Sequence, residues 1–502
     1  MSKIGVFDIV SHTAKFGLYD KLTTPALTSI MPQVVSVWLE KLGHKIDYQI
    51  ITSVNDLKNV DIDYDMVFIS SFTVSAYLAY AMSKYFRNYG IITVLGGPHA
   101  RSYKDDSLKY FDYVIGLCDK ELIINLMDIA ESHIDQQYGQ YISAEKHPTK
   151  LASVEDRWKY IEIVNKKKSW IMPNIIPMLG STGCPFNCEF CIDSKHKYQS
   201  MDLESIEKDL LFLQNVKEPV VMWHDPNFGV QFDKWMDLIK RTTINKRTIF
   251  LGELNLAKLT DDRVKQLARN GFANVSPGIE SWSAFNNKTA IRDYRTKYDK
   301  VYETSRHVNK IARYIPIIQA NIMFGLDCDT IEESFTLTKE FMRLTPTVYS
   351  NLQTLTVFGD STPTYKEFKK QNRILNLPYN LMDGYSTTNV KINCDINTFY
   401  EYYYDITKYY NSTNMVAKRV FKTKRFHPRL LHLSRALFNG KKIVSYYKDF
   451  YNNLKYYEYG DFYNGLTRVP PFDYLEQIKN ELGPFMKYLP NEIMEQFFYE
   501  TM

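Results

Sequence analysis

The sequence has few cysteines, no long apolar run and little net charge. Six cysteines in 502 residues are too few for a disulfide framework and fit a reducing compartment. No apolar run is long enough to cross a bilayer, and no signal-peptide core follows Met1. The net charge of +5 is slight and gives no electrostatic footprint of nucleic-acid binding. We therefore expect a cytoplasmic protein that has no membrane span and whose favoured partner is not a nucleic acid.

The composition that is present is that of a large globular chain. Hydrophobic residues make up 45% and charged residues 24% of the sequence. The length is sufficient for about three domains of ordinary size. Aromatic residues reach 15%, and the 38 tyrosines are densest toward the C-terminus.

Three of the six cysteines lie in one short stretch. Cys184, Cys188 and Cys191 have a Cys-x3-Cys-x2-Cys spacing. Soft sulfur ligands suit iron, and three thiolates on one loop can hold three irons of a [4Fe-4S] cluster, which leaves the fourth iron open to a chelating small molecule. A zinc site or a set of inert cysteines is the alternative. Zinc loops usually have paired Cys-x2-Cys knuckles and a fourth ligand, and no His or Cys follows here at that spacing.

This stretch resembles the signature of the radical S-adenosylmethionine superfamily, in which an aromatic residue, here Phe190, directly precedes the last cysteine. The resemblance implies a cluster that binds S-adenosylmethionine and cleaves it reductively to a 5'-deoxyadenosyl radical. It implies an external electron donor such as flavodoxin or ferredoxin. It also implies that Phe190 packs against the adenine.

Residues 1–138 alternate short apolar strands with amphipathic helices. The pattern predicts strands at 4–9, 46–51, 66–70, 91–95 and 113–115. Repeated units of this kind predict an α/β fold with a doubly wound parallel sheet, whose ligands bind at the carboxyl ends of the strands. Small or polar residues follow three of these strands: Ser70 and Thr73, then Gly96, Gly97, Pro98 and His99, then Gly116 and Glu121.

This order of features resembles the flavodoxin-like cobalamin-binding domain that precedes many radical S-adenosylmethionine enzymes. The resemblance implies that those eight residues contact cobalamin. The Asp-x-His-x-x-Gly motif that supplies an axial histidine in some cobalamin proteins is absent, since the segment from Asp8 to His12 has a different sequence. A flavodoxin-like scaffold without a ligand is the alternative.

A polar segment, 139–172, is expected to be a linker, and residues 173–390 repeat the strand and helix pattern. Strands are predicted at 175–179, 219–223, 248–254, 273–278, 315–324 and 348–357. They form a partial (β/α)6 barrel whose chemistry lies at the carboxyl ends of the strands. The residues at those ends are polar: His224, Asp225 and Asn227, then Glu253, then Ser276 and Glu280, then Asn321.

The superfamily resemblance implies that these residues, with Phe190, bind S-adenosylmethionine. His224, Asp225 and Asn227 match the position that holds the amino group. Asn321 stands where relatives have an aspartate for the ribose, and Asn can also accept and donate hydrogen bonds. Helix caps and hydrogen-bonded loop residues are the alternative for each of them.

Residues 391–502 are rich in tyrosine and predicted to be helical. Aromatic residues at helical spacing usually form core, although aromatic and basic residues together can also stack on nucleobases. We expect a helical domain that covers the barrel mouth and shapes the substrate pocket, with RNA binding as the lesser alternative.

Together these resemblances imply a cobalamin-dependent radical S-adenosylmethionine methyltransferase that acts on an unactivated carbon of a small-molecule or natural-product substrate. Such a reaction consumes two molecules of S-adenosylmethionine per product. Radical rearrangement, cyclisation or oxidation, with cobalamin in another role or absent, is the second hypothesis. A non-catalytic protein that carries a cluster is the third. No motif identifies the substrate.

Overall fold

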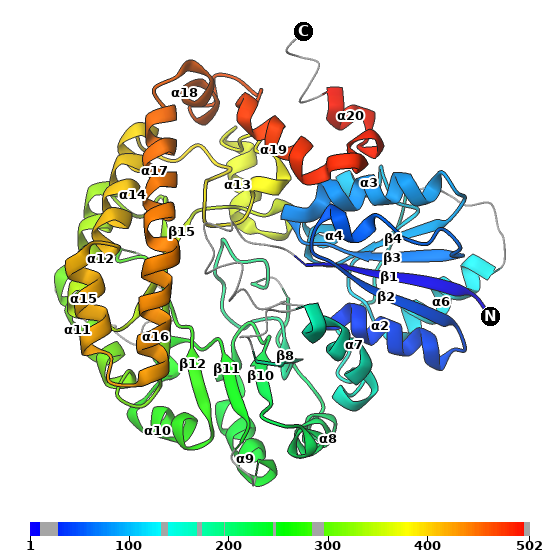
Figure 1. Cartoon of the computed structure of the whole chain (residues 1–502), viewed down its shortest axis with the longest axis horizontal. Helices are drawn as coiled ribbons and strands as arrows, with labels where there is room; N and C mark the ends of the chain where they lie inside the picture. The colour runs from blue at the N-terminus through cyan, green and yellow to red at the C-terminus, as the bar shows by residue number, and fades with distance from the viewer. Residues whose placement is uncertain are drawn as a thin grey trace.

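The computed structural model describes residues 1–10, 29–131, 139–167, 173–194, 196–243, 247–283 and 296–495. Two parallel sheets organise the chain, and their strands point toward a common central region (Figure 1). In that view the N-terminal sheet lies on the right and the second sheet at the bottom, while later helices form the left side and the top.

The N-terminal sheet has the strand order β2-β1-β3-β4-β5-β6, and every pairing in it is parallel. Helices cover both faces, because α2 and α6 share one hydrophobic core with the sheet and α3 shares another. The predicted doubly wound sheet is confirmed. The elements are β1 Lys3–Ile9, α2 Ile30–Lys41, β2 Lys45–Ile51, β3 Met66–Ser70, α3 Ala76–Arg87, β4 Ile92–Gly96, α4 Pro98–Ser102, α5 Lys104–Ser107, β5 Tyr113–Ile115, α6 Lys120–Glu131 and β6 Gln140–Ile142.

The segment that we expected to be a linker, 139–172, contains two elements. Strand β6 completes the first sheet beside β5, and helix α7, Val154–Lys167, packs against α2. A three-residue strand is too short to show a period of two in the sequence, and α7 has buried positions on one narrow face only.

The second sheet has seven strands in six positions, because β12 and β13 share one position. The order is β7, β10, β11, then β12 and β13 end to end, then β14 and β15. β12 and β13 both pair with β14, and the interruption between them falls at Pro277, which has no N–H to donate. The sheet does not close, which confirms the predicted partial barrel. Its strands are β7 Ile175–Met178, β10 Val220–Trp223, β11 Ile249–Gly252, β12 Phe272–Val275, β13 Gly278–Glu280, β14 Ile317–Phe324 and β15 Tyr349–Thr354. Its helices are α8 Leu203–Phe212, α9 Phe232–Thr242, α10 Asp261–Arg269, α11 Lys297–Ile311, α12 Ile331–Leu344 and α13 Pro363–Lys370.

Helix α14 of the C-terminal region extends the outer layer of the barrel. The aromatic face of α14 packs on α12, where Phe335 contacts Phe399 and Tyr403. Tyr400, Tyr403 and Tyr463 are almost fully buried, so the tyrosine enrichment mainly forms core. The helices are α14 Ile396–Tyr410, α15 Thr413–Lys422, α16 Phe426–Arg435, α17 Lys441–Asn453, α18 Tyr457–Tyr463, α19 Phe472–Leu482 and α20 Asn491–Met494.

The end of the described chain returns to the N-terminal domain. Leu475, Ile478 and Leu482 of α19, with Phe485 after it, belong to the same core as the α3 face of the first sheet. This contact joins the first and last parts of the chain around the barrel (Figure 1).

Candidate active site

The three clustered cysteines lie on a hairpin at the carboxyl end of β7. Strand β8, Ser181–Thr182, pairs antiparallel with β9, Gln199–Ser200, and closes the loop between them. At the base of the loop Gly183 has φ +65°, and a Cβ there would lie 2.5 Å from the carbonyl oxygens of His196 and Lys197. The amide of Cys184 donates to the His196 carbonyl at 3.2 Å. The backbone therefore holds the cysteine loop compactly, and only glycine fits its first turn.

The donor set of this hairpin suits an iron-sulfur cluster. All six cysteines lie in the described ranges and none forms a disulfide; Cys184, Cys188 and Cys191 are each half-buried. Within the described residues no three His, Cys, Asp or Glu side chains converge as ligands of a metal ion. A cluster does not require such convergence, because each thiolate binds a different iron atom.

Asp225, directly after β10, is bonded to the start of this hairpin. Its carboxylate accepts hydrogen bonds from the Gly180 amide at 2.8 Å and from the Ser181 hydroxyl at 2.5 Å. The side chain is 2% exposed, and burial raises the pKa of this carboxyl to about 6. Asp225 was expected to contact S-adenosylmethionine; the structure shows it positioning the cysteine hairpin. Gly180 and Ser181 were not predicted as its partners, because no sequence pattern indicates a contact across 45 residues.

The other residues at the end of β10 link three neighbouring strands. The amide of His224 donates to the Met178 carbonyl at 2.8 Å, and burial lowers the pKa of its imidazole to about 4, so the ring is neutral. The side-chain oxygen of Asn227 accepts from the amides of Gly229 at 3.1 Å and Asn255 at 3.4 Å. The Glu253 carbonyl accepts from the Phe228 amide. The ends of β7, β10 and β11 are therefore held in one register.

Carboxamide side chains line the inner face of β14 and β15. The side-chain oxygen of Asn321 accepts from Gln319 at 3.1 Å and from Asn351 at 3.0 Å. Tyr385 lies beside Asn351, and its pKa is raised, mainly by burial. Sequence reasoning missed Asn351 and Tyr385; β15 is largely polar, so its sequence does not single out Asn351. A wall of uncharged donors and acceptors can bind hydroxyls and ring nitrogens without a charged partner.

A hydroxyl and a carboxamide also pair at the end of the neighbouring strand β12. The Ser276 hydroxyl donates to the side-chain oxygen of Asn274 at 3.1 Å. Phe190, from the cysteine loop, is partly buried against the barrel core. The structure thus brings Phe190, Ser276 and Asn321 to the same end of the barrel.

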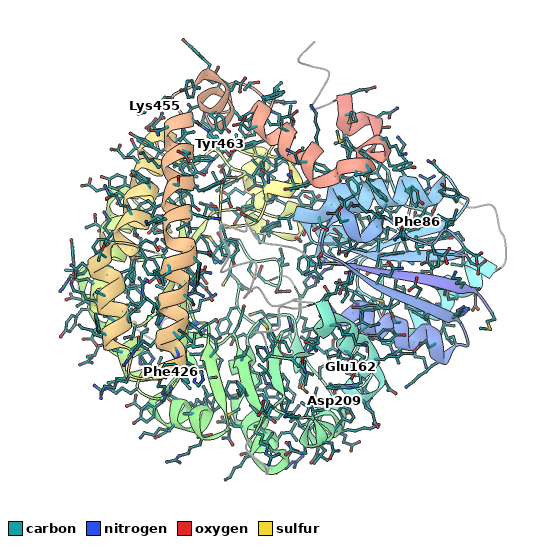
Figure 2. All side chains as sticks on the ribbon, viewed as in Figure 1. Phe86, Glu162, Asp209, Phe426, Lys455 and Tyr463 are labelled. Carbon is teal, nitrogen blue, oxygen red and sulfur yellow. The ribbon has the colours of Figure 1, made fainter. Side chains whose placement is uncertain are left out.

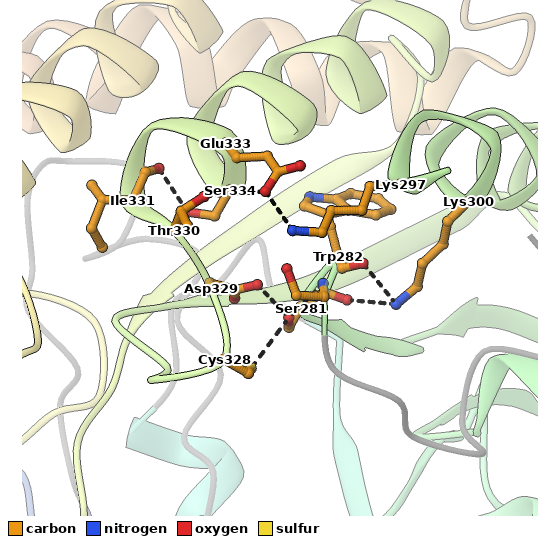
Figure 3. A network of polar contacts seen from close by, with 11 residues as sticks. Ser281, Trp282, Lys297, Lys300, Cys328, Asp329, Thr330, Ile331, Glu333 and Ser334 are labelled. Carbon is orange, nitrogen blue, oxygen red and sulfur yellow. Dashed lines mark hydrogen bonds and ion pairs between the residues drawn. The ribbon is translucent and has the colours of Figure 1, made fainter. Parts of the chain in front are cut away.

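Polar side chains also fasten the loop after β14 to the end of β13 (Figure 3). The Ser281 hydroxyl donates to Asp329 at 2.7 Å, and Cys328 lies 3.8 Å from the same hydroxyl. Lys300, which is 1% exposed, donates to the carbonyls of Ser281 and Trp282, and burial lowers the pKa of its amine to about 8. Sequence reasoning did not select Lys300 or Asp329.

Glu280 directly precedes this network. It is buried and has φ +63°, a conformation that is uncommon for residues other than glycine. Such strain is found where surrounding structure fixes a side chain for a task, and Glu280 lies at the carboxyl end of β13.

At the first sheet, the turn after β4 approaches the end of β3 closely. Gly97 has φ +95°, and a Cβ there would lie 2.8 Å from the Ser71 carbonyl oxygen, whereas a Cβ on Gly96 would meet nothing within 4 Å. Ser70 ends β3 and Pro98 begins α4. Of the two glycines in this turn, Gly96 is therefore the one with open space beside it.

His99 is enclosed by protein. It is fully buried, shares a 2.7 Å hydrogen bond with the Tyr80 hydroxyl, lies 3.4 Å from the Thr73 hydroxyl and stacks on Tyr103. Burial lowers the pKa of the imidazole to about 3, so it is neutral. His99 and Thr73 thus lie on the inside of the turn.

The last two predicted cobalamin residues have different surroundings. A Cβ on Gly116 would lie 2.2 Å from the Tyr141 hydroxyl, so side chains of the strand after it occupy that space. Glu121 lines a cavity of about 570 Å³ together with Trp38, Asp119 and Gln199. Gln199 belongs to the hairpin that carries the cysteines, so the cavity lies between the first domain and that hairpin.

The carboxyl ends of the two sheets touch each other. The hydroxyls of Ser102, after β4, and Ser361, after β15, are 2.8 Å apart. Gly359, with φ +51°, allows this contact, since a Cβ there would lie 1.9 Å from the Ser102 carbonyl oxygen. The Thr364 amide donates to the Glu189 carbonyl of the cysteine loop at 3.2 Å. The two predicted cofactor sites therefore lie on facing edges.

A buried arginine joins the two sheets on another side. Arg157 of α7 is 2% exposed and donates to the side chain of Gln33 at 2.9 Å and to the carbonyls of Ala152 and Pro177 at 3.1 and 3.3 Å. Gln33 belongs to α2 and Pro177 to β7, so one guanidinium connects a helix of the first sheet with the first strand of the second.

Comparison with known proteins identifies the central region. The family model described as the radical SAM superfamily matches residues 178–336, which include the three cysteines and strands β10 to β14. The chain therefore carries a radical S-adenosylmethionine domain. It is accordingly an enzyme of this type, and the superfamily implies a [4Fe-4S] cluster and S-adenosylmethionine as its cofactors.

Two curated relatives extend the similarity beyond the barrel. Over 423 residues, this radical S-adenosylmethionine enzyme is 27% identical to bacteriochlorophyllide d C-8(2)-methyltransferase of Chlorobaculum tepidum, which covers 80% of this chain and 88% of that protein. It is 25% identical to bacteriochlorophyllide d C-12(1)-methyltransferase of the same organism, over 64% of this chain and 69% of that protein.

The fold as a whole is similar to a solved structure. The radical S-adenosylmethionine methyltransferase TsrM from Kitasatospora setae, determined with cobalamin and a [4Fe-4S] cluster bound, superposes with a TM-score of 0.51 at 15% identity, over 74% of this chain and 78% of that chain. A second TsrM structure, with tryptophan and a S-adenosylmethionine analogue bound, gives a TM-score of 0.52 at 14% identity, over 73% and 76%. The order of an α/β domain, a partial barrel and C-terminal helices is thus a known fold. No helix in the described ranges is long and apolar enough to cross a membrane.

Proposed function

We propose that this enzyme is a cobalamin-dependent methyltransferase that methylates an unactivated carbon. The observation that carries the proposal is the contact between the two strand-end edges, at the hydroxyls of Ser102 and Ser361, because it makes the two expected cofactor sites face each other. The curated relatives support it, since both are named as C-methyltransferases. TsrM supports it as a cobalamin-bound methyltransferase of similar fold.

The chain's residues have distinct roles in this proposal. Cys184, Cys188 and Cys191 hold the cluster, and Asp225 positions their hairpin through Ser181. When bound, the cluster and S-adenosylmethionine supply hydrogen-atom abstraction, and methylcobalamin supplies the methyl group. The residues that we assign to S-adenosylmethionine are Phe190, His224, Asn227, Glu253, Ser276, Glu280 and Asn321.

At the carboxyl edge of the first sheet we assign the predicted residues to cobalamin. Gly96 and Glu121 border open space and contact cobalamin most directly, while Thr73 and His99 shape the turn from behind. Ser70, Gly97, Pro98 and Gly116 complete that edge. Cobalamin binds without a protein histidine from the absent motif; residues 11 and 12 of that segment lie outside the described ranges.

The domain limits and cellular setting belong to the proposal as well. We assign residues 1–142 to the cobalamin-binding domain, since β6 completes its sheet, 173–390 to the radical domain and 391–502 to the helical domain. We assign the enzyme to the cytoplasm, where flavodoxin or ferredoxin supplies electrons.

The test is the product balance of the anaerobically reconstituted enzyme. With methyl-labelled S-adenosylmethionine, an electron donor and bacteriochlorophyllide d as the first probe substrate, we expect equal amounts of 5'-deoxyadenosine, S-adenosylhomocysteine and methylated product. Corrin absorbance of the purified protein reports bound cobalamin. Formation of 5'-deoxyadenosine with no S-adenosylhomocysteine would contradict methyl transfer and favour a radical rearrangement, cyclisation or oxidation. Absence of any turnover that depends on Cys184 would instead support a non-catalytic protein.

A further inference from the structure

The segment from the end of α14 to the middle of α17 is strongly basic. Between residues 406 and 448 the sequence has eleven Lys and Arg residues and no Asp or Glu. Since the whole chain carries +5, the remainder carries −6. The positive charge of this otherwise slightly acidic protein is therefore concentrated on one helical region.

The same segment exposes large apolar side chains. Phe421 is 81% exposed, Phe426 69%, Leu430 52% and Leu437 66%. Phe426, Leu430 and Leu433 recur at spacings of four and three residues, so they share one face of α16, and Leu437 follows in the π-helical turn Ala436–Gly440. Pro428 and His432 on the other side of α16 are buried. A helix that buries its opposite side thus leaves an apolar stripe in solvent.

Lysines precede and follow this stripe in the sequence. Lys422, Lys424, Lys441 and Lys442 are all exposed. Arg425 is instead fixed to the barrel, because it donates to the Tyr314 carbonyl at 2.7 Å. Figure 2 labels Phe426 at the start of the long rod formed by α16 and α17. The stripe and its lysines are therefore presented outward by a helix that is anchored to the barrel.

We propose that the surface formed by Phe421, Phe426, Leu430, Leu437 and the four flanking lysines docks on an anionic lipid bilayer. A helix with Lys and Arg beside exposed Phe and Leu lies in the membrane interface, with its apolar side chains among the acyl chains and its cations at the headgroups. No described helix can cross the bilayer, so the contact is peripheral.

Charge decides between this partner and two others. A second copy of the chain would bring the four exposed lysines of one surface against the same four of the other, which is repulsive. A nucleic acid would pair with the cations but would not cover the stripe of aliphatic side chains, whereas a bilayer of anionic lipid satisfies both features.

The experiment is sedimentation of the full-length enzyme with lipid vesicles. We expect binding to vesicles of phosphatidylcholine with phosphatidylglycerol, weak binding to phosphatidylcholine alone, and release by salt. The apolar variant F426S/L430S/L437S should bind at least about tenfold more weakly. The variant K422Q/K424Q/K441Q/K442Q should lose about fivefold for each cation removed.

Matched controls replace similar side chains elsewhere. Y298S/Y302S removes two aromatic rings on α11 that are each 59% exposed, and K109Q/K208Q/K265Q/K310Q removes four lysines on other surfaces. Both controls should bind as the wild type does. Unchanged melting temperatures will show that every variant is folded, as expected for exposed positions.

Three outcomes would overturn the inference. One is that the enzyme binds both vesicle types equally and that the lysine variant binds them as the wild type does. Another is a dimer that the apolar variant dissociates, with no vesicle binding by the wild type. The third is tight binding of single-stranded RNA without binding of vesicles. None of these readouts depends on catalysis, so the result is independent of the proposed methyl transfer.

Discussion

The hydroxyl of Ser181 donates a 2.5 Å hydrogen bond to Asp225, and this bond connects the cysteine hairpin to the neighbouring strand of the barrel. The same carboxylate accepts from the Gly180 amide. Asp225 is buried, and its carboxyl pKa is raised to about 6. Above that pH the side chain is an ionised carboxylate, and this form accepts both hydrogen bonds. One buried carboxylate thus fixes the start of the cysteine hairpin to the end of β10.

Replacing this carboxylate should loosen the cluster loop. Asp225→Asn removes the charge from two hydrogen bonds, each of which contributes roughly 1.5–3 kcal/mol when one partner is charged. We expect a lower melting temperature and a lower iron content after reconstitution. The control Asp233→Asn changes a carboxylate that is 72% exposed and should leave both unchanged. Wild-type iron retention in D225N would contradict this positioning role.

The three clustered cysteines should differ sharply from the other three. Alanine at Cys184, Cys188 or Cys191 removes an iron ligand, so we expect loss of cluster absorbance and of all 5'-deoxyadenosine formation. Cys394→Ala is the control, because burial raises the pKa of that thiol to about 11 and the thiol stays protonated. Iron content and turnover are measured on each variant; a cluster that survives in C188A would refute the ligand assignment.

Gly359 should control the contact between the two sheet edges. Gly359→Ala must displace the Ser102 backbone, since its Cβ would lie 1.9 Å from that carbonyl oxygen. Gly384→Ala is a matched control, because Gly384 also has a positive φ, +76°, but a Cβ there meets nothing within 4 Å. We expect G359A to form 5'-deoxyadenosine in excess over methylated product, while G384A keeps the wild-type ratio. Equal ratios in both variants would show that the contact does not couple the two sites.

Arg157 should contribute strongly to stability. Arg157→Met leaves the buried acceptors of Gln33, Ala152 and Pro177 without their donor, which costs roughly 3 kcal/mol of unfolding free energy. Arg241→Met, at a side chain that is 54% exposed, should cost less than about 1 kcal/mol. Urea unfolding curves measure both. A small effect in R157M would mean that water replaces the guanidinium.

His99 should make stability depend on pH. Its pKa is lowered from 6.5 to about 3, so between these values the unfolded chain binds a proton that the folded chain does not. The stabilisation is therefore complete above about pH 6.5 and is lost as pH falls toward 3, by about 1.4 kcal/mol per pH unit. Urea unfolding measures the free energy of unfolding at each pH between 7 and 5. The dependence of this free energy on pH should be weaker in His99→Gln than in the wild type, by up to one proton. An identical slope would show that His99 is not enclosed in solution.

Most of the fold was predictable because both sheets carry strong local signals. The strands Ile4–Ile9 and Tyr113–Ile115 were located almost to the residue, since buried parallel strands are short apolar runs. β6 and the position of α14 were not predicted. The first is too short for a periodic pattern, and the second depends on aromatic packing against Phe335, which no local pattern encodes.

The candidate site divides in the same way. The sequence by itself determined the cluster, because three cysteines within eight residues are brought together by chain connectivity alone. It also placed polar residues at the strand ends, since a parallel sheet brings those ends to one edge. Tertiary structure alone decided that Asp225 binds the cysteine hairpin, that His99 is enclosed and that Ser102 meets Ser361. These contacts join residues tens to hundreds of positions apart, so they depend on how the sheets pack and not on the local sequence.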